Sequence, residues 1–279
     1  MGDFEKLGVV VKYEFIKHLR RKRLYVIFGI ALLVEALVLI LIPVLRDGYP
    51  QDSISILGIT TQGVMIMAGL LTIGPSLAAI GAVFFAGDAI AGEYEGKTGF
   101  LLFINPIKRH LLWIGKYIAG FIAVTLLIIF TYIIIAIALG IIYHQVPLEI
   151  FESFGLCVFY AAATLSVTFL FSSFSKGAMG ATVMTLLFVW VICGIVESVL
   201  AYTGNAYWFI LSAGGDSIAL PYGSIQQMMS GMGMGGEHMN DLISNWQPLT
   251  TGMASWGMLI YLVVGFGGSL WFARRRQLA

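Results

Sequence analysis

Charged side chains are scarce in this sequence: Asp, Glu, Lys and Arg together make up 11% of 279 residues. Hydrophobic residues make up 59%, and the mean hydropathy is +0.91. A soluble domain of this length normally carries about 25% charged residues. The chain therefore lacks the polar side chains that would cover a globular surface in water, and the composition predicts an integral membrane protein.

Cysteine is almost absent as well, and both Cys157 and Cys193 lie in apolar runs. A disulfide framework needs more cysteines and an aqueous outer domain, so we expect these two to be small apolar core residues. The sequence also lacks internal repeats and any polar segment long enough for a soluble domain. We therefore expect residues 1–279 to form a single transmembrane domain.

Six apolar runs are long enough to cross a bilayer, which takes about 20 helical residues. They cover residues 24–45, 63–87, 111–143, 151–171, 180–200 and 250–272. Gly74-Pro75 interrupts the second run and predicts a kink, and the third run is long enough to tilt. The first run is too long for a cleaved signal, whose apolar region has about 7–15 residues. The fold class expected is an all-α integral membrane protein with six transmembrane helices.

The Lys and Arg residues predict how these helices are oriented. With the N-terminus in the cytoplasm, every Lys and Arg except Arg46 falls on the cytoplasmic side. The outer loops instead carry the acids Asp47, Asp52, Glu149, Glu152, Asp216, Glu237 and Asp241. We therefore expect both termini in the cytoplasm and the protein in the cell (cytoplasmic) membrane. The largest aqueous segments are then residues 88–109 inside and 201–249 outside.

Residues 1–23 have the pattern of a basic amphipathic helix. Leu7, Val11, Phe15 and Leu19 recur every four residues. The basic residues on or near the water side are Lys6, Lys17, Arg20, Arg21, Lys22 and Arg23. Such a helix lies in the headgroup plane and leads into the first span. It either only orients the protein or also docks a partner.

The segment 88–109 contains Gly92 and then Gly96-Lys97-Thr98, which superficially resembles a phosphate-binding loop. A phosphate-binding loop has four residues between its glycines and follows a β-strand. Here three residues separate the glycines and a membrane span comes before them, so we do not expect this chain to bind nucleotide. Thr98 can instead cap a short helix over the apolar residues 100–104, which Pro106 would end. That helix would either fill a groove on another protein or pack against lipid headgroups.

The order and character of these segments resemble the membrane subunits of type 2 ABC exporters, the ABC-2 permease family. The residues that carry the resemblance are Glu93, Thr98, Leu101, Leu102, Pro106, Arg109, Gly115 and Lys116. The N-terminal elbow helix, the turn 172–178 and the large outer loop before the sixth span also fit, so the resemblance covers nearly the whole chain. Lys97-Thr98-Gly99 stands where many members have Gly-Thr-Leu.

The resemblance implies a permease subunit of an exporter with an unidentified substrate. Two such subunits, identical or paired with a sister chain, would associate with two soluble ATPase subunits. ATP and Mg²⁺ would be used in those ATPases, no cofactor would be bound by this chain, and no nucleic acid is expected as a partner.

The resemblance also implies roles for individual residues. Residues 100–104 would form the coupling helix seated in the ATPase. Glu93 and Glu95 would face the elbow cations Arg20, Arg21, Lys22 and Arg23. The full set implied to couple the chain to the ATPase is Glu93, Glu95, Thr98, Phe100, Leu101, Leu102, Phe103, Pro106 and Arg109.

Two carboxylates lie inside predicted spans. Glu35 follows Leu24 by 11 residues, so it sits about 16 Å into a hydrocarbon layer about 30 Å thick. A charge at that depth costs about 2.5–3.5 kcal/mol on insertion scales. Glu35 should therefore face protein or water, or be protonated. In the family that this chain resembles, spans one, two and five tend to line the substrate path, so the resemblance implies that Glu35 and Glu197 lie beside it; otherwise Glu35 is a protonated packing residue. Glu197 lies near the outer end of the fifth span, where it either snorkels to the interface, which we favour, or lines the path.

The outer segment 228–239 has five methionines and one histidine. Thioethers beside an imidazole suit Cu(I), which gives the candidate ligand set Met232, Met234, His238 and Met239. A flexible methionine-rich contact surface explains the composition equally simply and is the reading we favour, so no metal site is expected.

Two other classes of protein compete with the permease. An ion-coupled carrier or channel that works alone would use Glu35 as its ion site. A membrane enzyme would need several polar groups at one membrane face, whereas the histidines are scattered singly at His18, His110, His144 and His238. We therefore do not expect an enzyme. Copurification of an ATPase separates the permease from both alternatives.

Overall fold

The structure is a computed structural model that describes residues 2–20, 22–48, 61–96, 109–223 and 248–275. Within these ranges all regular secondary structure is helical. Five helical stretches are long and apolar enough to cross a membrane, and the bent pair of α1 and α2 supplies a sixth. The chain is therefore an all-α membrane protein, as the composition predicted.

The first three spans follow an amphipathic helix, α1 (Asp3–Arg20), which meets the first span at 63°. The first span is α2 (Lys22–Gly48). The second is broken into α4 (Thr61–Leu71), α5 (Ile73–Ile80) and α6 (Ala82–Ala86). The first break falls at Thr72, just before Pro75, because proline has no N–H to give to the carbonyl four residues earlier. After the short α7 (Ala91–Glu95), the third span is α9 (Arg109–Tyr143).

The fourth span is α10 (Ile150–Phe174). The fifth consists of α11 (Ala178–Leu186), the π-helix η1 (Leu187–Ile192) and α12 (Cys193–Tyr202). The sixth is α16 (Thr251–Arg275). Each predicted apolar run coincides with one of these helical stretches, and α9, with 35 residues, is longer than a bilayer requires.

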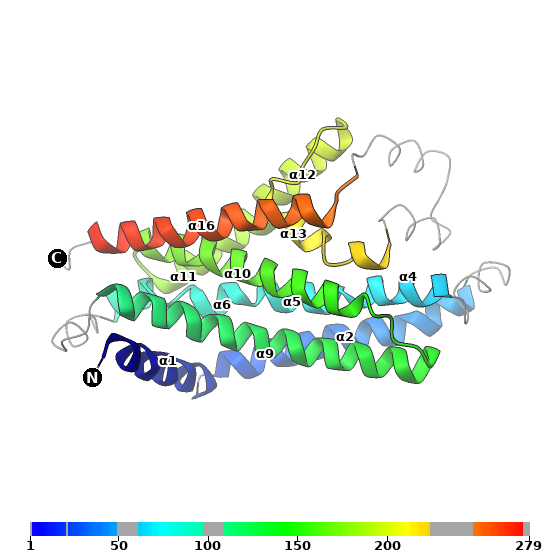
Figure 1. Cartoon of the computed structure of the whole chain (residues 1–279), viewed down its shortest axis with the longest axis horizontal. Coiled ribbons are helices and arrows are strands. Elements are labelled where there is room, and N and C mark those ends of the chain that lie inside the picture. Colours follow the sequence, from blue (N-terminus) through cyan, green and yellow to red (C-terminus); the bar gives the residue numbers. More distant parts are fainter. Residues whose placement is uncertain (1, 21, 49–60, 97–108, 224–247, 276–279) are drawn as a thin grey trace.

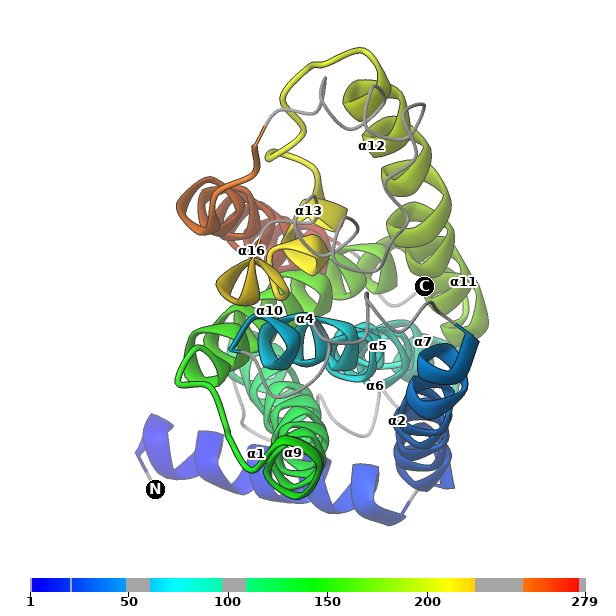
Figure 2. The ribbon, with the colours of Figure 1, turned by 90° about the vertical axis from the view of Figure 1, so that its right-hand side faces the viewer.

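Helix α10 occupies the centre of the bundle and packs closely along α16 (Figure 2). Small residues make this approach possible. A Cβ atom on Gly265 would lie 2.9 Å from the Ser166 carbonyl carbon, and one on Gly268 would lie 2.9 Å from Leu170 Cδ1. Close packing of backbones through glycine is typical of helices in membranes, where hydrophobic burial does not drive association.

The connection between the fifth and sixth spans is not simply an aqueous loop. Its first part folds back into the bundle through α13 (Leu211–Asp216) and the 3₁₀ turn η2 (Leu220–Tyr222). Leu211, Ala213 and Ile218 are fully buried there. The whole of residues 201–249 was expected to be an aqueous outer loop, whereas most of residues 207–222 pack against the spans.

One end of the bundle gathers the elements of interest. Helix α1 lies across this end at a steep angle to the spans and packs on the start of α9, and α10 and α16 end at the same end of the bundle (Figures 1 and 2). We call this the elbow end. Basic residues described at this end include Lys6, Lys12, Lys17 and Arg20 of α1, Lys116 of α9, Arg275 of α16 and Lys176 in the turn after α10. This agrees with the predicted separation of charge between the two membrane faces.

Candidate functional site

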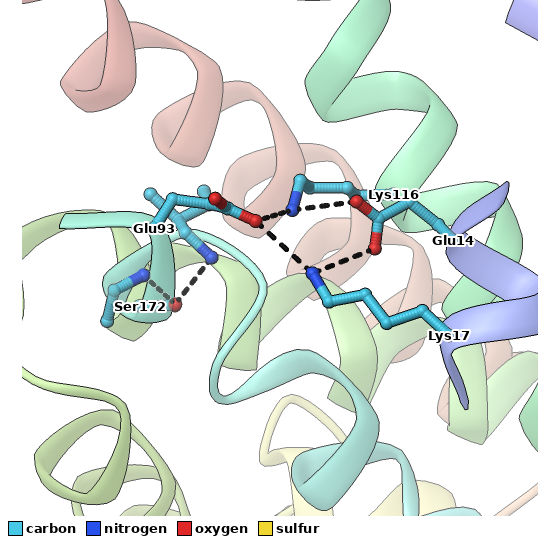
Figure 3. Close-up of polar contacts among 7 residues, drawn as sticks. Glu14, Lys17, Glu93, Lys116 and Ser172 are labelled. Carbon is cyan, nitrogen blue, oxygen red and sulfur yellow. Dashed lines mark hydrogen bonds and ion pairs between the residues drawn. The ribbon is translucent and has the colours of Figure 1, made fainter. Parts of the chain in front are cut away.

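Four charged side chains meet at the elbow end and form what we call the ion cluster: Glu14 and Lys17 of α1, Glu93 of α7 and Lys116 of α9 (Figure 3). Lys116 Nζ lies 2.6 Å from Glu93 Oε1 and 3.0 Å from Glu14 Oε1. Lys17 Nζ lies 3.2 Å from Glu93 Oε1 and 3.4 Å from Glu14 Oε2. Each acid thus contacts both cations, and the cluster ties three separate segments together.

The ion cluster is largely shielded from water. The side chain of Lys116 is 2% exposed and that of Glu93 is 11% exposed, whereas that of Lys17 is 38% exposed. Burial alone would raise the pKa of Glu14, but the charges of Lys116 and Lys17 outweigh it and hold the pKa below its usual value. Charge-assisted hydrogen bonds with this little solvent are stronger than surface ion pairs.

Helix packing brings the cluster together. A Cβ atom on Gly115 would clash with the side chain of Val10, so the glycine lets α1 lie directly on α9. Val10 is buried at this contact. Lys116 follows Gly115, and Glu14 follows Val10 by one helical turn, so the same close approach aligns the two charges.

Ser172, near the end of α10, holds the start of α7 (Figure 3). Its hydroxyl accepts hydrogen bonds from the backbone N–H groups of Ile90 at 3.2 Å and Ala91 at 3.0 Å. It donates one to the carbonyl of Gly87 at 2.9 Å. Ser172 is fully buried, so α7 is fixed to the fourth span as well as to the ion cluster.

Glu95, at the end of α7, contacts the fifth span. Its Oε2 atom accepts a hydrogen bond from the backbone N–H of Ala178 at 2.8 Å. The resemblance had placed Glu95 beside the elbow; in the structure its carboxylate lies at the start of α11 instead. The difference arises because the two acids of α7 are two residues apart, and such a spacing turns their side chains to different sides of a helix.

The other residues implied to couple the chain to an ATPase lie largely outside the described residues. Thr98, Phe100, Leu101, Leu102, Phe103 and Pro106 belong to the segment 97–108, and the side chain of Arg109 is not described. Among the elbow cations, Arg20 is exposed, and the side chains of Arg21, Lys22 and Arg23 are not described. The coupling helix and the contact of Glu93 with these four cations remain predictions.

Glu35 is buried in the bundle at 1% exposure. Neither carboxylate oxygen has a hydrogen-bond partner among the described residues. Its side chain packs against Gly74 of α5, where an added Cβ would overlap the carboxylate. Glu35 is thus enclosed by the bundle in this conformation. Whether it lines a path or is a protonated packing residue remains a prediction.

Glu197 of α12 is half-buried and forms a hydrogen bond with Asp216 of α13. Burial and this neighbouring carboxyl raise the pKa of Asp216 well above its usual value. A hydrogen bond between two carboxyl groups requires that one of them be protonated. The contact shows that Glu197 packs against the folded part of the outer connection; its role in a path stays a prediction. The methionines and the histidine proposed for Cu(I), Met232, Met234, His238 and Met239, lie outside the described residues.

Sequence reasoning missed Glu14, Lys17 and Ser172, and it gave Lys116 no role beyond the resemblance. One signal was available for Lys116, because a lysine two turns into an apolar span needs a buried counter-charge. Nothing in the sequence identifies Ser172 among the serines of its turn.

The helices define the class of this molecule: a multi-pass α-helical membrane protein whose spans are joined at one end by an ion cluster. Over residues 10–194 the sequence matches the model of a family described as ABC-2 family transporter protein. This match covers more than half of the chain and includes the whole ion cluster, so the protein belongs to the ABC-2 transporter family. A comparison with the curated proteins finds no match.

Proposed function

We propose that this chain is the permease subunit of an ABC exporter and moves its substrate with energy from ATP hydrolysis in a separate ATPase subunit. The ATPase binds ATP and Mg²⁺, and a second permease subunit, identical or a sister chain, completes the transporter. Both termini and the elbow end lie in the cytoplasm, where the ATPase docks on residues 100–104.

The ion cluster is the observation that carries this proposal. The segment that would contact an ATPase begins directly after α7, and α7 is fastened to the elbow and to the third span by Glu93. A push on that segment therefore acts on α1 and α9 together, because buried charged contacts resist separation. An amphipathic helix with no such connection would only anchor the chain.

Copurification tests the proposal. We expect an ATPase to copurify with the detergent-solubilised chain from its native membrane and to be lost with Leu102→Arg, which places a charge in the proposed coupling helix. Leu148→Arg is the control, because Leu148 is 80% exposed at the opposite end of the bundle. An ATPase that stays bound to the Leu102→Arg chain would contradict the proposed docking site.

Glu35 supports a second candidate, an ion-coupled carrier or channel that works alone. A buried carboxyl that meets no hydrogen-bond partner in the described part of the chain is a typical proton or cation site in such proteins. Transport by vesicles that contain this chain and no second polypeptide would favour the carrier over the permease.

A further inference from the structure

We propose that Glu95 is a positioning residue that transmits movement of α7 to the fifth span by capping the first turn of α11. This inference rests on the proposed function, because an ATPase is what would move α7. It separates the two acids of α7 by role: Glu93 acts on the elbow and the third span, and Glu95 acts on the fifth span.

The cap is needed because α11 has none of its own. The first N–H groups of a helix have no acceptor within that helix, and a Ser, Thr, Asp or Asn just before it usually supplies one. Gly177 occupies that position and has no side chain to offer. The acceptor for the N–H of Ala178 is instead Glu95, which lies 83 residues earlier in the chain. A carboxylate at a helix N-terminus is also favoured by the helix dipole.

A second contact joins the same elements. A Cβ atom on Gly87 would overlap the hydroxyl of Thr182, so the end of the second span lies directly against α11 one turn after the cap. Ser172 holds Gly87 and the first N–H groups of α7 in place. The end of the second span, α7 and the start of the fifth span therefore form one connected unit.

The fifth span is otherwise weakly held within the chain. In the most apolar part of the fifth span 17% of the residues are buried, whereas the corresponding share in the second and fourth spans is 67%. Its exposed side chains include Val183, Trp190 and Ile195. Within its own chain, the fifth span is therefore held mainly through α11, which packs on α10, α6 and α7, and through α12, which packs on α13.

The π-helix η1 gives the fifth span a place to bend. Residues 187–192 separate α11 from α12, and π-helical turns interrupt the regular α-helical hydrogen bonds and often occur at functional sites. Beyond η1, α12 is held by its packing against α13. Movement delivered at Ala178 can therefore tilt α11 while α12 keeps its outer contact.

The experiment uses amide hydrogen exchange on the complete transporter with its copurified ATPase in lipid nanodiscs. Exchange of residues 178–192 and of residues 3–20 is compared without nucleotide and with ATP and vanadate. Glu95→Ala removes the acceptor, and Glu95→Gln keeps an acceptor oxygen but loses the charge. Glu152→Ala is the control, since Glu152 is exposed at the opposite end.

In the wild type and in Glu152→Ala we expect nucleotide to change exchange in residues 178–192 by about fivefold or more, the scale expected for loss of a helix cap. In Glu95→Ala that change is lost, whereas the change in residues 3–20 remains. Glu95→Gln keeps part of the response and serves as the test if the alanine variant does not fold.

Two results would overturn this proposal alone. One is that ATP and vanadate change the amide exchange of residues 178–192 by the same factor in both Glu95 variants as in the wild type. The other is an equal rise in exchange with and without nucleotide, which would make Glu95 a structural cap only. Absence of any ATPase from the wild-type preparation is a different result and overturns the proposed function together with this inference.

Discussion

At the scale of single residues, the two lysines of the ion cluster differ in their surroundings more than in their contacts. Each contacts both Glu14 and Glu93, yet the side chain of Lys116 is 2% exposed and that of Lys17 is 38% exposed. Loss of one member of a buried charge pair leaves the others uncompensated in a medium that solvates them poorly. Loss of an exposed partner is largely compensated by water.

We therefore predict that Lys116→Ala lowers the free energy of unfolding by about 3–5 kcal/mol and Lys17→Ala by about 1 kcal/mol or less. Thermal unfolding of the detergent-solubilised chain, followed by circular dichroism, measures both. The double variant Lys116→Met/Glu93→Gln is the control, since it removes a cation and an anion together and should be less destabilised than Lys116→Ala. An equal decrease in the free energy of unfolding for the two single lysine variants would mean that the burial of Lys116 adds nothing to the strength of its ion pairs.

The resemblance identified Glu93 and Lys116 as part of a pattern but did not predict that they contact each other. Residue type and spacing along a chain do not say which of sixteen basic residues an acid will meet. That depends on the crossing of α1 and α9, which is set by Gly115 and Val10. The acceptor role of Glu95 was not predicted for the same reason, because it depends on where α11 begins.

At the scale of elements, the contact between α1 and α9 decides whether the elbow is part of the bundle or only lies beside it. Gly115 and Gly8 make a useful comparison. A Cβ atom on Gly115 would meet Val10, whereas one on Gly8 would have no atom within 4 Å. The same kind of substitution therefore has opposite consequences at the two positions.

Gly115→Val is expected to displace α1 from α9 at a cost of about 1–3 kcal/mol. Gly8→Ala should leave the contact intact and favour the helix by up to about 1 kcal/mol. The measurement is the rate at which a water-soluble maleimide labels Val10→Cys in a background without Cys157 and Cys193. We expect faster labelling with Gly115→Val and an unchanged rate with Gly8→Ala. An unchanged rate in both would show that the elbow does not depend on this glycine.

The elements themselves were mostly predictable, because apolar length and proline act locally. The six predicted spans match helices in the structure, and the break before Pro75 was expected. The burial of α13 and the π-helix in the fifth span were not predicted. The burial of α13 depends on its packing against α10 and α16, which leaves no regular pattern in the sequence.

At the scale of the whole molecule, the distribution of charge and the pattern of burial independently indicate the same orientation of the bundle, with the elbow end at the cytoplasmic face. The described residues of the two charged sets lie at opposite ends of the spans: Lys17, Lys116 and Lys176 at the elbow end, and Glu149 and Glu152 at the other. Charge alone predicts which end stays in the cytoplasm, because positively charged segments are retained there. Packing alone predicts that α1 stays at the surface of that end, since Phe4 and Tyr13 remain exposed.

This arrangement predicts which residues can be labelled from each side of the membrane. Lys176→Cys and Glu152→Cys, each in a background without Cys157 and Cys193, place one thiol at an exposed position at each end. In intact cells we expect an impermeant maleimide to label Glu152→Cys and not Lys176→Cys; after permeabilisation it should label both. Labelling of Lys176→Cys in intact cells would invert the topology. The ion cluster and α7 would then face away from the compartment that holds ATP, and neither Glu93 nor Glu95 could receive movement from an ATPase.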